Sequence, residues 1–158
     1  MTRMKVTAAQ VMTGNVLTVR ADWPVNQLVD FLADHAISGA PVVSSGQEPI
    51  GVVSLTDVAR MGALGEKDKS DVPAFYRHDL ARFIARDEMH GLHVTAESQT
   101  TVGDIMTPMV FSVTEDASVQ EVAEAMLTGR IHRVFVTRDG KLVGIISAMD
   151  LLPLVRDL

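Results

Sequence analysis

The chain has 158 residues, with 14 Lys and Arg against 20 Asp and Glu, a formal net charge of −6 and no cysteine. This length suits one compact domain, and the lack of cysteine excludes a disulfide framework, a thiolate metal site and a cysteine nucleophile. The acidic balance and the scattered aromatic residues argue against nucleic acid as a partner. At the start of the chain, residues 1–10 lack the apolar core of a signal peptide, and no later stretch is long enough to span a bilayer. We therefore expect a cytoplasmic protein with no membrane partner.

An internal repeat divides the chain into two halves. Residues 11–19 resemble residues 105–113, with Met12 and Met106 lying 94 positions apart. After the next turn the offset becomes 93, because residues 50–57 correspond to residues 143–150. A repeat of this kind indicates two copies of one structural unit. The predicted domains are one motif over 7–62, a linker insertion over 63–101 and a second motif over 102–158.

The first half is predicted to fold in the order strand, helix, strand, strand, helix. Apolar residues at helical spacing follow Pro24, and two continuous apolar runs flank a turn, which favours a small sheet covered on both faces. The predicted elements are a strand over 17–19, a helix from Pro24, strands over 40–43 and 50–53, and a helix that begins after the N-cap candidate Ser54.

The linker insertion is more polar than its flanks. Leu80, Phe83 and Ile84 predict one short amphipathic helix. His90 and His93 could belong to a metal or hydrolytic cluster with nearby residues, but Gly91 would interrupt the helix that such a pair needs. An enzyme is therefore the least favoured class. The other members of that cluster would be His78, Asp87 and Glu88.

The second half repeats the order of the first. Its predicted elements are a strand over 110–113, a helix that opens at Ser118, strands over 134–137 and 142–146, and a helix that begins after Ser147. Glycines are expected at the same places in both halves, just beyond the first helix and in the hairpin turn, where they would supply positive φ. These glycines are Gly39 and Gly129 after the helices, and Gly46 and Gly140 in the turns.

Both halves close with the pattern Gly-apolar-apolar-Ser, followed three residues later by Asp57 or Asp150. A strand that turns there into a helix presents hydroxyls, backbone N–H groups and a positive helix end, which suit phosphate oxygens. A carboxylate can accept both hydroxyls of a ribose, and the glycine is interpreted as room for a flat base. Ser and Asp at a helix start are commonly a simple cap, but their recurrence after the same strand favours a ligand site.

This closing pattern, with the Met-Thr pairs at residues 12–13 and 106–107, resembles the cystathionine-β-synthase-type (CBS) motif, and two such motifs make a Bateman module. The resemblance implies an α/β (α+β) fold of two β-α-β-β-α motifs, related by a pseudo-twofold axis and packed through their small sheets. It implies two clefts that take an adenine nucleotide such as AMP, ADP or ATP as a regulatory ligand. No catalytic residue, metal or required cofactor is expected.

The resemblance also assigns residues to each cleft, with Asp on ribose and a preceding hydroxyl near phosphate. The first site would comprise Ser54, Thr56, Asp57, Ser38 and Gly39, faced by Thr107, Met109, Phe111 and Ile131. The second would comprise Ser147, Asp150, His132 and Arg133, faced by Thr13, Asn15, Leu17 and Ile37. The sites differ, since Gly39 corresponds to Arg133 and Thr56 to Met149, which is interpreted as core filler.

Two alternatives stay open. The module could be a structural dimerisation module with empty clefts, or its ligand could be S-adenosylmethionine or NAD. A homodimer is expected in either case, because the closing helices carry more apolar residues than one sheet face can bury. The regulated partner would be another polypeptide, which the sequence does not specify. The apolar residues concerned are Val58, Met61 and Leu64 in the first half and Leu151, Leu152, Leu154 and Val155 in the second.

Overall fold

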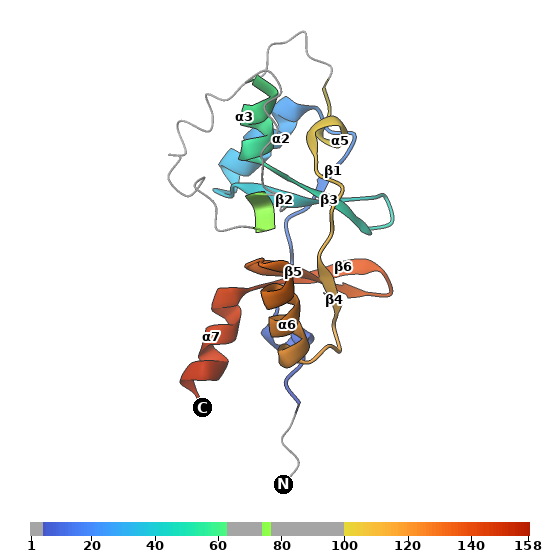
Figure 1. Ribbon diagram of the computed structural model, residues 1–158. Coiled ribbons are helices and arrows are strands. Elements are labelled where there is room, and N and C mark those ends of the chain that lie inside the picture. The colour runs from blue at the N-terminus through green and yellow to red at the C-terminus, as the bar shows by residue number, and fades with distance from the viewer. Residues whose placement is uncertain (1–4, 63–73, 77–99) are drawn as a thin grey trace. The chain divides into compact units, whose positions relative to one another are not determined.

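The computed structural model describes residues 5–62, 74–76 and 100–158 (Figure 1). The fold is mixed α/β and divides into two compact units. The first unit is Leu17–Met109, and the second unit joins Met1–Val16 to Val110–Leu158. Each unit contains one three-stranded sheet. The α/β fold class predicted from the repeat is confirmed.

The elements of the first unit follow the predicted order. Its first strand begins two residues later than predicted, and the helix after Pro24 and the hairpin are present as expected. The elements are β1 Val19–Arg20, α2 Val25–Asp34, β2 Gly39–Val43, β3 Pro49–Ser54, α3 Leu55–Gly62, the 3-10 helix η1 Ala74–Tyr76 and α5 Val102–Ile105. The predicted linker helix at residues 80–84 lies outside the described residues.

The second unit repeats the succession strand, helix, strand, strand, helix, and η1 has no counterpart among its described elements. Its first strand also begins two residues later than predicted, while Ser118 and Ser147 are the N-caps of their helices as expected. The elements are α1 Ala8–Val11, β4 Ser112–Thr114, α6 Val119–Gly129, β5 Arg133–Arg138, β6 Lys141–Ser147 and α7 Ala148–Arg156.

The two sheets share one topology. In each, the first two strands pair in parallel and the last two form an antiparallel hairpin. The register shifts between Val42 and Val43 in the first hairpin and between Val136 and Thr137 in the second. These positions correspond under the sequence repeat, so the repeat extends to the irregularities of the hairpins.

Each unit is completed by a segment from the other half of the sequence. We name residues 11–16 the first Met-Thr segment and residues 105–109 the second. Val52 and Thr107 exchange two backbone hydrogen bonds of 2.9 Å in the first unit. Thr13 and Ile145 exchange two of 2.9 and 3.0 Å in the second. Each compact unit therefore combines residues of both halves of the repeat, because each Met-Thr segment pairs with the last strand of the opposite half.

The glycine of the closing pattern makes room for this exchange. A Cβ on Gly51 would lie 2.6 Å from the carbonyl oxygen of Thr107, and a Cβ on Gly144 would overlap the side chain of Met12. The interpretation of these glycines as room for a flat base was wrong. The space over each glycine is filled by a Met-Thr segment of the chain itself.

The core of the first unit lies between its sheet and the helices α2 and α3. Val19, Leu28, Leu32, Val53 and Leu55 are buried members of this cluster. Residues 40–43 and 51–54 are buried without alternation, so both faces of the hairpin are covered as predicted. None of the described helices has the length and apolar composition of a membrane span.

Two glycine predictions for the helix ends were wrong. Helix α2 ends at Asp34, and the left-handed residue after it is Ala36, with φ of 53°. Helix α6 contains Gly129, and its left-handed cap is Arg130, with φ of 52°. In the hairpin turns, positive φ falls on Gln47, Asp139 and Gly140. At the two helix ends the closure is local, because the Ile37 N–H donates to Leu32 O and the Ile131 N–H donates to Met126 O, both at 3.0 Å.

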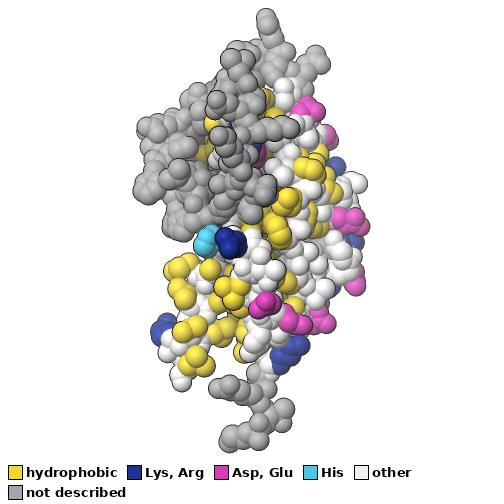
Figure 2. Space-filling view, in the orientation of Figure 1, with side chains coloured by type: hydrophobic (Ala, Val, Ile, Leu, Met, Phe, Trp, Pro, Cys, Tyr) yellow, Lys and Arg dark blue, Asp and Glu magenta, His cyan; other side chains and the backbone are white. Residues whose placement is uncertain are grey.

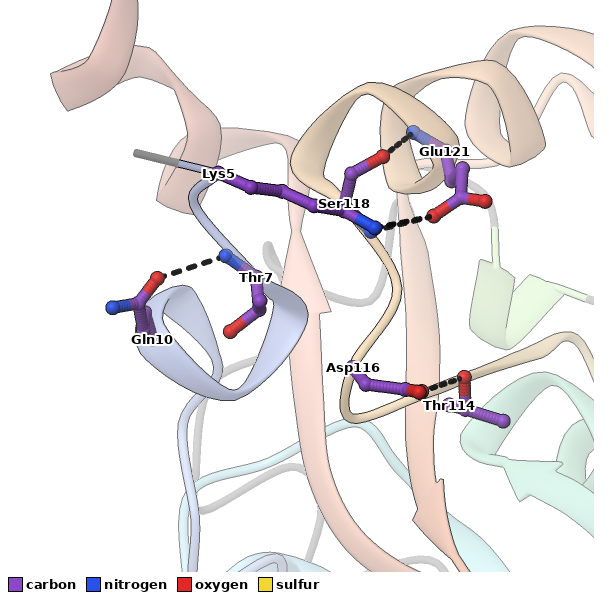
Figure 3. Close-up of polar contacts among 7 residues, drawn as sticks. All are labelled: Lys5, Thr7, Gln10, Thr114, Asp116, Ser118 and Glu121. Carbon is purple, nitrogen blue, oxygen red and sulfur yellow. Dashed lines mark hydrogen bonds and ion pairs between the residues drawn. The ribbon is translucent and has the colours of Figure 1, made fainter. Parts of the chain in front are cut away.

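Helix α6 begins with a reciprocal capping box (Figure 3). The Ser118 N–H donates to Glu121 Oε2 at 2.6 Å, and the Glu121 N–H donates to Ser118 Oγ at 3.1 Å. The pKa of Glu121 lies below its ordinary value of 4.5. The largest cause is the hydrogen bond from the Ser118 N–H, followed by the Ser118 hydroxyl and the charge of Lys5. Because a carboxylate with a lowered folded-state pKa stabilises the fold above its unfolded-state pKa, this contribution is lost as pH falls below about 4.5.

Replacement of Glu121 by Gln is therefore expected to make the free energy of unfolding fall less steeply as the pH is lowered. The neutral amide can still accept the Ser118 N–H, as Gln10 Oε1 accepts the Thr7 N–H at 2.9 Å (Figure 3). Urea unfolding between about pH 3 and pH 6 would show a smaller loss of unfolding free energy in the variant than in the wild type. An equal loss of unfolding free energy with falling pH in the two proteins would contradict this expectation.

Candidate functional site

The junction of β6 and α7 places the predicted residues Ser147 and Asp150 side by side. Asp150 Oδ2 accepts the Ser147 N–H at 2.8 Å and the Ser147 hydroxyl at 3.1 Å. Both contacts use one carboxylate oxygen, and among the described residues Oδ1 of Asp150 has no hydrogen-bond partner. This half-buried side chain therefore combines a capping role with a second acceptor oxygen.

The junction of β3 and α3 repeats this geometry in the first unit. Asp57 Oδ2 accepts the Ser54 N–H at 2.8 Å and the Ser54 hydroxyl at 3.3 Å. Here Oδ1 lies 3.8 Å from Arg60 Nη1, and the Asp57 side chain is only 11% exposed. Ser54 is buried and Thr56 is half-buried. The first carboxylate thus lies beside a cation.

The start of each hairpin brings the other predicted residues to the same place. Gly39 pairs with Ser54, and Arg133 pairs with Ser147. The backbone just before them caps the following helix, since Ser38 O accepts the Leu55 N–H at 2.9 Å and His132 O accepts the Ala148 N–H at 2.8 Å. The predicted hydroxyl, carboxylate and backbone groups therefore meet at one end of each sheet.

Each Met-Thr segment carries two of the predicted facing residues. In the first unit Thr107 pairs with β3, and its carbonyl accepts the Met109 N–H at 2.8 Å. In the second unit Thr13 pairs with β6, and Asn15 is left-handed with φ of 51°. Of the remaining facing residues, Phe111 and Ile131 of the first site belong to the second unit, and Leu17 and Ile37 of the second site belong to the first unit.

An open groove of about 470 Å³ lies between α6 and α7. Two predicted residues, Ile131 and His132, line it. The prediction of Met149 as core filler was wrong, because this side chain is 70% exposed on α7. Sequence reasoning missed the other lining residues, since an amphipathic helix gives no signal of which neighbour its exposed edge borders. They are Ala123, Met126, Leu127, Arg130, Ala148 and Leu151.

The pair Phe75 and Tyr76 was also missed, although it lies at the first site. η1 packs against β3, and both aromatic side chains are buried. The Tyr76 hydroxyl donates to Met109 O at 2.8 Å. Their adjacency in the sequence was visible, but nothing local indicated the element against which they pack.

The histidines and carboxylates of the possible metal cluster, residues 78–93, lie outside the described residues. Within the described ranges, no group of three or more His, Asp and Glu side chains could hold a metal ion.

Comparison with known proteins assigns the family. The CBS domain family model matches residues 8–63 and 102–157, so the chain belongs to the CBS domain family. It is 25% identical over 134 residues to the chloroplastic CBS domain-containing protein CBSX2 of Arabidopsis thaliana, which covers 84% of this chain and 56% of that protein. The chain thus spans little more than half the length of this curated relative.

Solved structures of CBS pairs have the same fold. A structure of CBSX2 in complex with AMP matches with a TM-score of 0.65 and 22% identity, covering 96% of this chain and 97% of that chain. The CBS domain pair of protein MJ0100, in complex with 5-methylthioadenosine and S-adenosyl-L-methionine, matches with a TM-score of 0.64 and 19% identity, covering 97% and 98% of the two chains. The tandem CBS architecture inferred from the sequence is confirmed.

Proposed function

We propose that this chain is a regulatory module that binds an adenosine-containing ligand and catalyses no reaction. The observation that carries the proposal is the junction of β6 and α7, where Asp150 uses one carboxylate oxygen for the cap and keeps Oδ1 as an acceptor. Ribose hydroxyls are donors that such an acceptor can take. Arg133, paired with Ser147, is the expected phosphate contact. The AMP and S-adenosylmethionine complexes of similar CBS pairs support this choice of ligand.

Ligand binding would stabilise the native state of the module, and this stabilisation would be the regulatory signal. An adenine nucleotide of the AMP, ADP or ATP type is the proposed ligand, with S-adenosylmethionine and NAD as alternatives. The signal is proposed to pass to another polypeptide. We propose only that this partner is a protein, without naming it.

Thermal unfolding with AMP, ADP, ATP, S-adenosylmethionine and NAD tests the proposal. A ligand that binds the native state alone, at a hundred times its dissociation constant, adds about 2.7 kcal/mol of stability. For a chain of this size that corresponds to a rise of roughly 5–10 °C in the unfolding midpoint. No shift with any of the five compounds at millimolar concentration would contradict the proposal and leave the dimerisation module as the favoured function.

Homodimerisation is a second proposed property, supported by the exposed apolar side chains of α6 and α7. Leu127, Met149, Leu152 and Val155 are 53–75% exposed, and Figure 2 shows hydrophobic side chains gathered over α7. Patches of this kind mark interfaces. The first closing helix does not contribute as predicted, since Val58 is buried in its own unit and Met61 packs against that core. Leu64 lies outside the described residues.

Light scattering at micromolar concentration is expected to give twice the chain mass for the wild type. Leu152→Glu combined with Val155→Glu should give a monomer, because two carboxylates would be buried without partners at the interface. Leu158→Glu, which adds charge beyond the end of α7, is the control and should stay dimeric. A monomeric wild type would contradict the proposal.

A further inference from the structure

The only described part of the chain between residues 62 and 100 is η1, and it is firmly packed. Tyr76 is 0% exposed and Phe75 is 5% exposed. Their rings meet edge to face with centroids 5.4 Å apart. Burial of two neighbouring aromatic side chains strongly favours the position in which they are held. η1 is thus part of the first unit's packed structure.

The residues beside η1 are those predicted to hold the ligand in the first site. Phe75 Cδ2 lies 3.0 Å from the point that a Cβ on Gly39 would occupy, and Ser54 Cβ lies 3.3 Å from the same point. The Tyr76 hydroxyl donates to the carbonyl oxygen of Met109. Phe75 therefore lies over the paired residues at the sheet end, and Tyr76 takes a main-chain acceptor of the facing segment.

The first site has Gly39 where the second has Arg133, and this difference agrees with the packing of Phe75 over Gly39. An arginine at position 39, as at the corresponding position 133, would run into Phe75 and into the carbonyl oxygen of Val53, which is 2.9 Å from the same point. In the second site Arg133 and Asp150 are half-buried. Gly39 thus suits a site filled by an aromatic ring, and Arg133 suits a site that meets an anion.

We infer that Phe75 and Tyr76 occupy the first ligand site, so that the chain binds one adenine nucleotide, at the site of Asp150. The inference rests on the proposed function for the ligand. The Phe75 ring covers the apolar surface, and the Tyr76 hydroxyl binds the backbone carbonyl, that an adenine base would otherwise contact. Removal of these side chains opens a second site around Ser38, Ser54 and Asp57.

Cysteine protection tests the occupancy without any nucleotide. The chain has no cysteine, so Ser54→Cys introduces a single thiol beside Gly39. A small maleimide should label it slowly, and about tenfold faster or more when Phe75→Ala and Tyr76→Ala are added, since reaction then needs no local opening. Ser147→Cys, at the corresponding position of the second unit, is the control and should label at one rate in both backgrounds. Equal rates for Ser54→Cys in the two backgrounds would overturn the inference.

Titration calorimetry with AMP and ATP then counts the sites. We expect one equivalent for the wild type and two for Phe75→Ala/Tyr76→Ala, with circular dichroism confirming that the variant is folded. Phe75→Ala alone, which retains the Tyr76 hydrogen bond, is a milder second variant and should weaken the protection in the same direction. Two equivalents in the wild type, or weaker binding after loss of Phe75, would overturn the inference. Faster labelling without any nucleotide binding would uphold the occupancy of the site by η1 and contradict the proposed function.

Discussion

Replacement of Asp150 by alanine is expected to lower the affinity for adenine nucleotide by roughly 10- to 100-fold. The reason is the loss of the acceptor oxygen that we assign to the ribose hydroxyls, since hydrogen bonds to a charged group contribute about 1.5–3 kcal/mol. Titration calorimetry on wild type and variant would measure the change.

The same substitution also removes the cap of α7, so a matched control is needed. Asp104 Oδ2 accepts the Thr101 N–H at 2.9 Å and the Thr101 hydroxyl at 3.1 Å, which is the geometry of Asp150 at a helix start outside the proposed site. Asp104→Ala should lose a similar cap, of about 1 kcal/mol, and bind nucleotide as the wild type does. Equal affinity losses in the two variants would show that Asp150 acts through folding, and unchanged affinity in Asp150→Ala would contradict its role at the ribose.

Replacement of Gly51 by alanine is expected to destabilise the first unit by about 2–3 kcal/mol or more, the upper range for overpacking. Its Cβ would lie 2.6 Å from Thr107 O and 3.2 Å from Pro108 Cα, both backbone atoms. The paired hydrogen bonds between Val52 and Thr107 prevent the Met-Thr segment from moving away without loss of the pairing. Urea unfolding would measure the change as a fall in the midpoint.

Two other glycines set the scale for this prediction. A Cβ on Gly144 would meet the flexible side chain of Met12, which can move, so Gly144→Ala should cost less than Gly51→Ala. A Cβ on Gly46 has no neighbour closer than 3.8 Å, and Gly46→Ala should be neutral or slightly stabilising. If Gly51→Ala is as stable as Gly46→Ala, close approach of the Met-Thr segment is not what requires glycine there.

Local sequence patterns were enough to predict the two halves, the order of their elements and the helix starts after Ser54 and Ser147. These features depend on local patterns: apolar spacing separates strands from helices, and a capping serine with an acidic residue three positions later satisfies the first backbone N–H groups of a helix. The repeat also shows that Asp57 corresponds to Asp150, and this correspondence predicts the candidate site from the sequence.

Which segments pair with one another depends on the three-dimensional fold. Thr13 pairs with Ile145 and Thr107 with Val52 because edge positions on the opposite half offer unpaired backbone groups, and no local pattern specifies which half supplies the partner. The requirement for glycine at position 51 follows from this pairing, because Thr107 O would lie 2.6 Å from its Cβ. Phe75 and Tyr76 are buried against residues far away in the sequence, because burial of aromatic side chains is non-directional and depends on the surface that the fold leaves open.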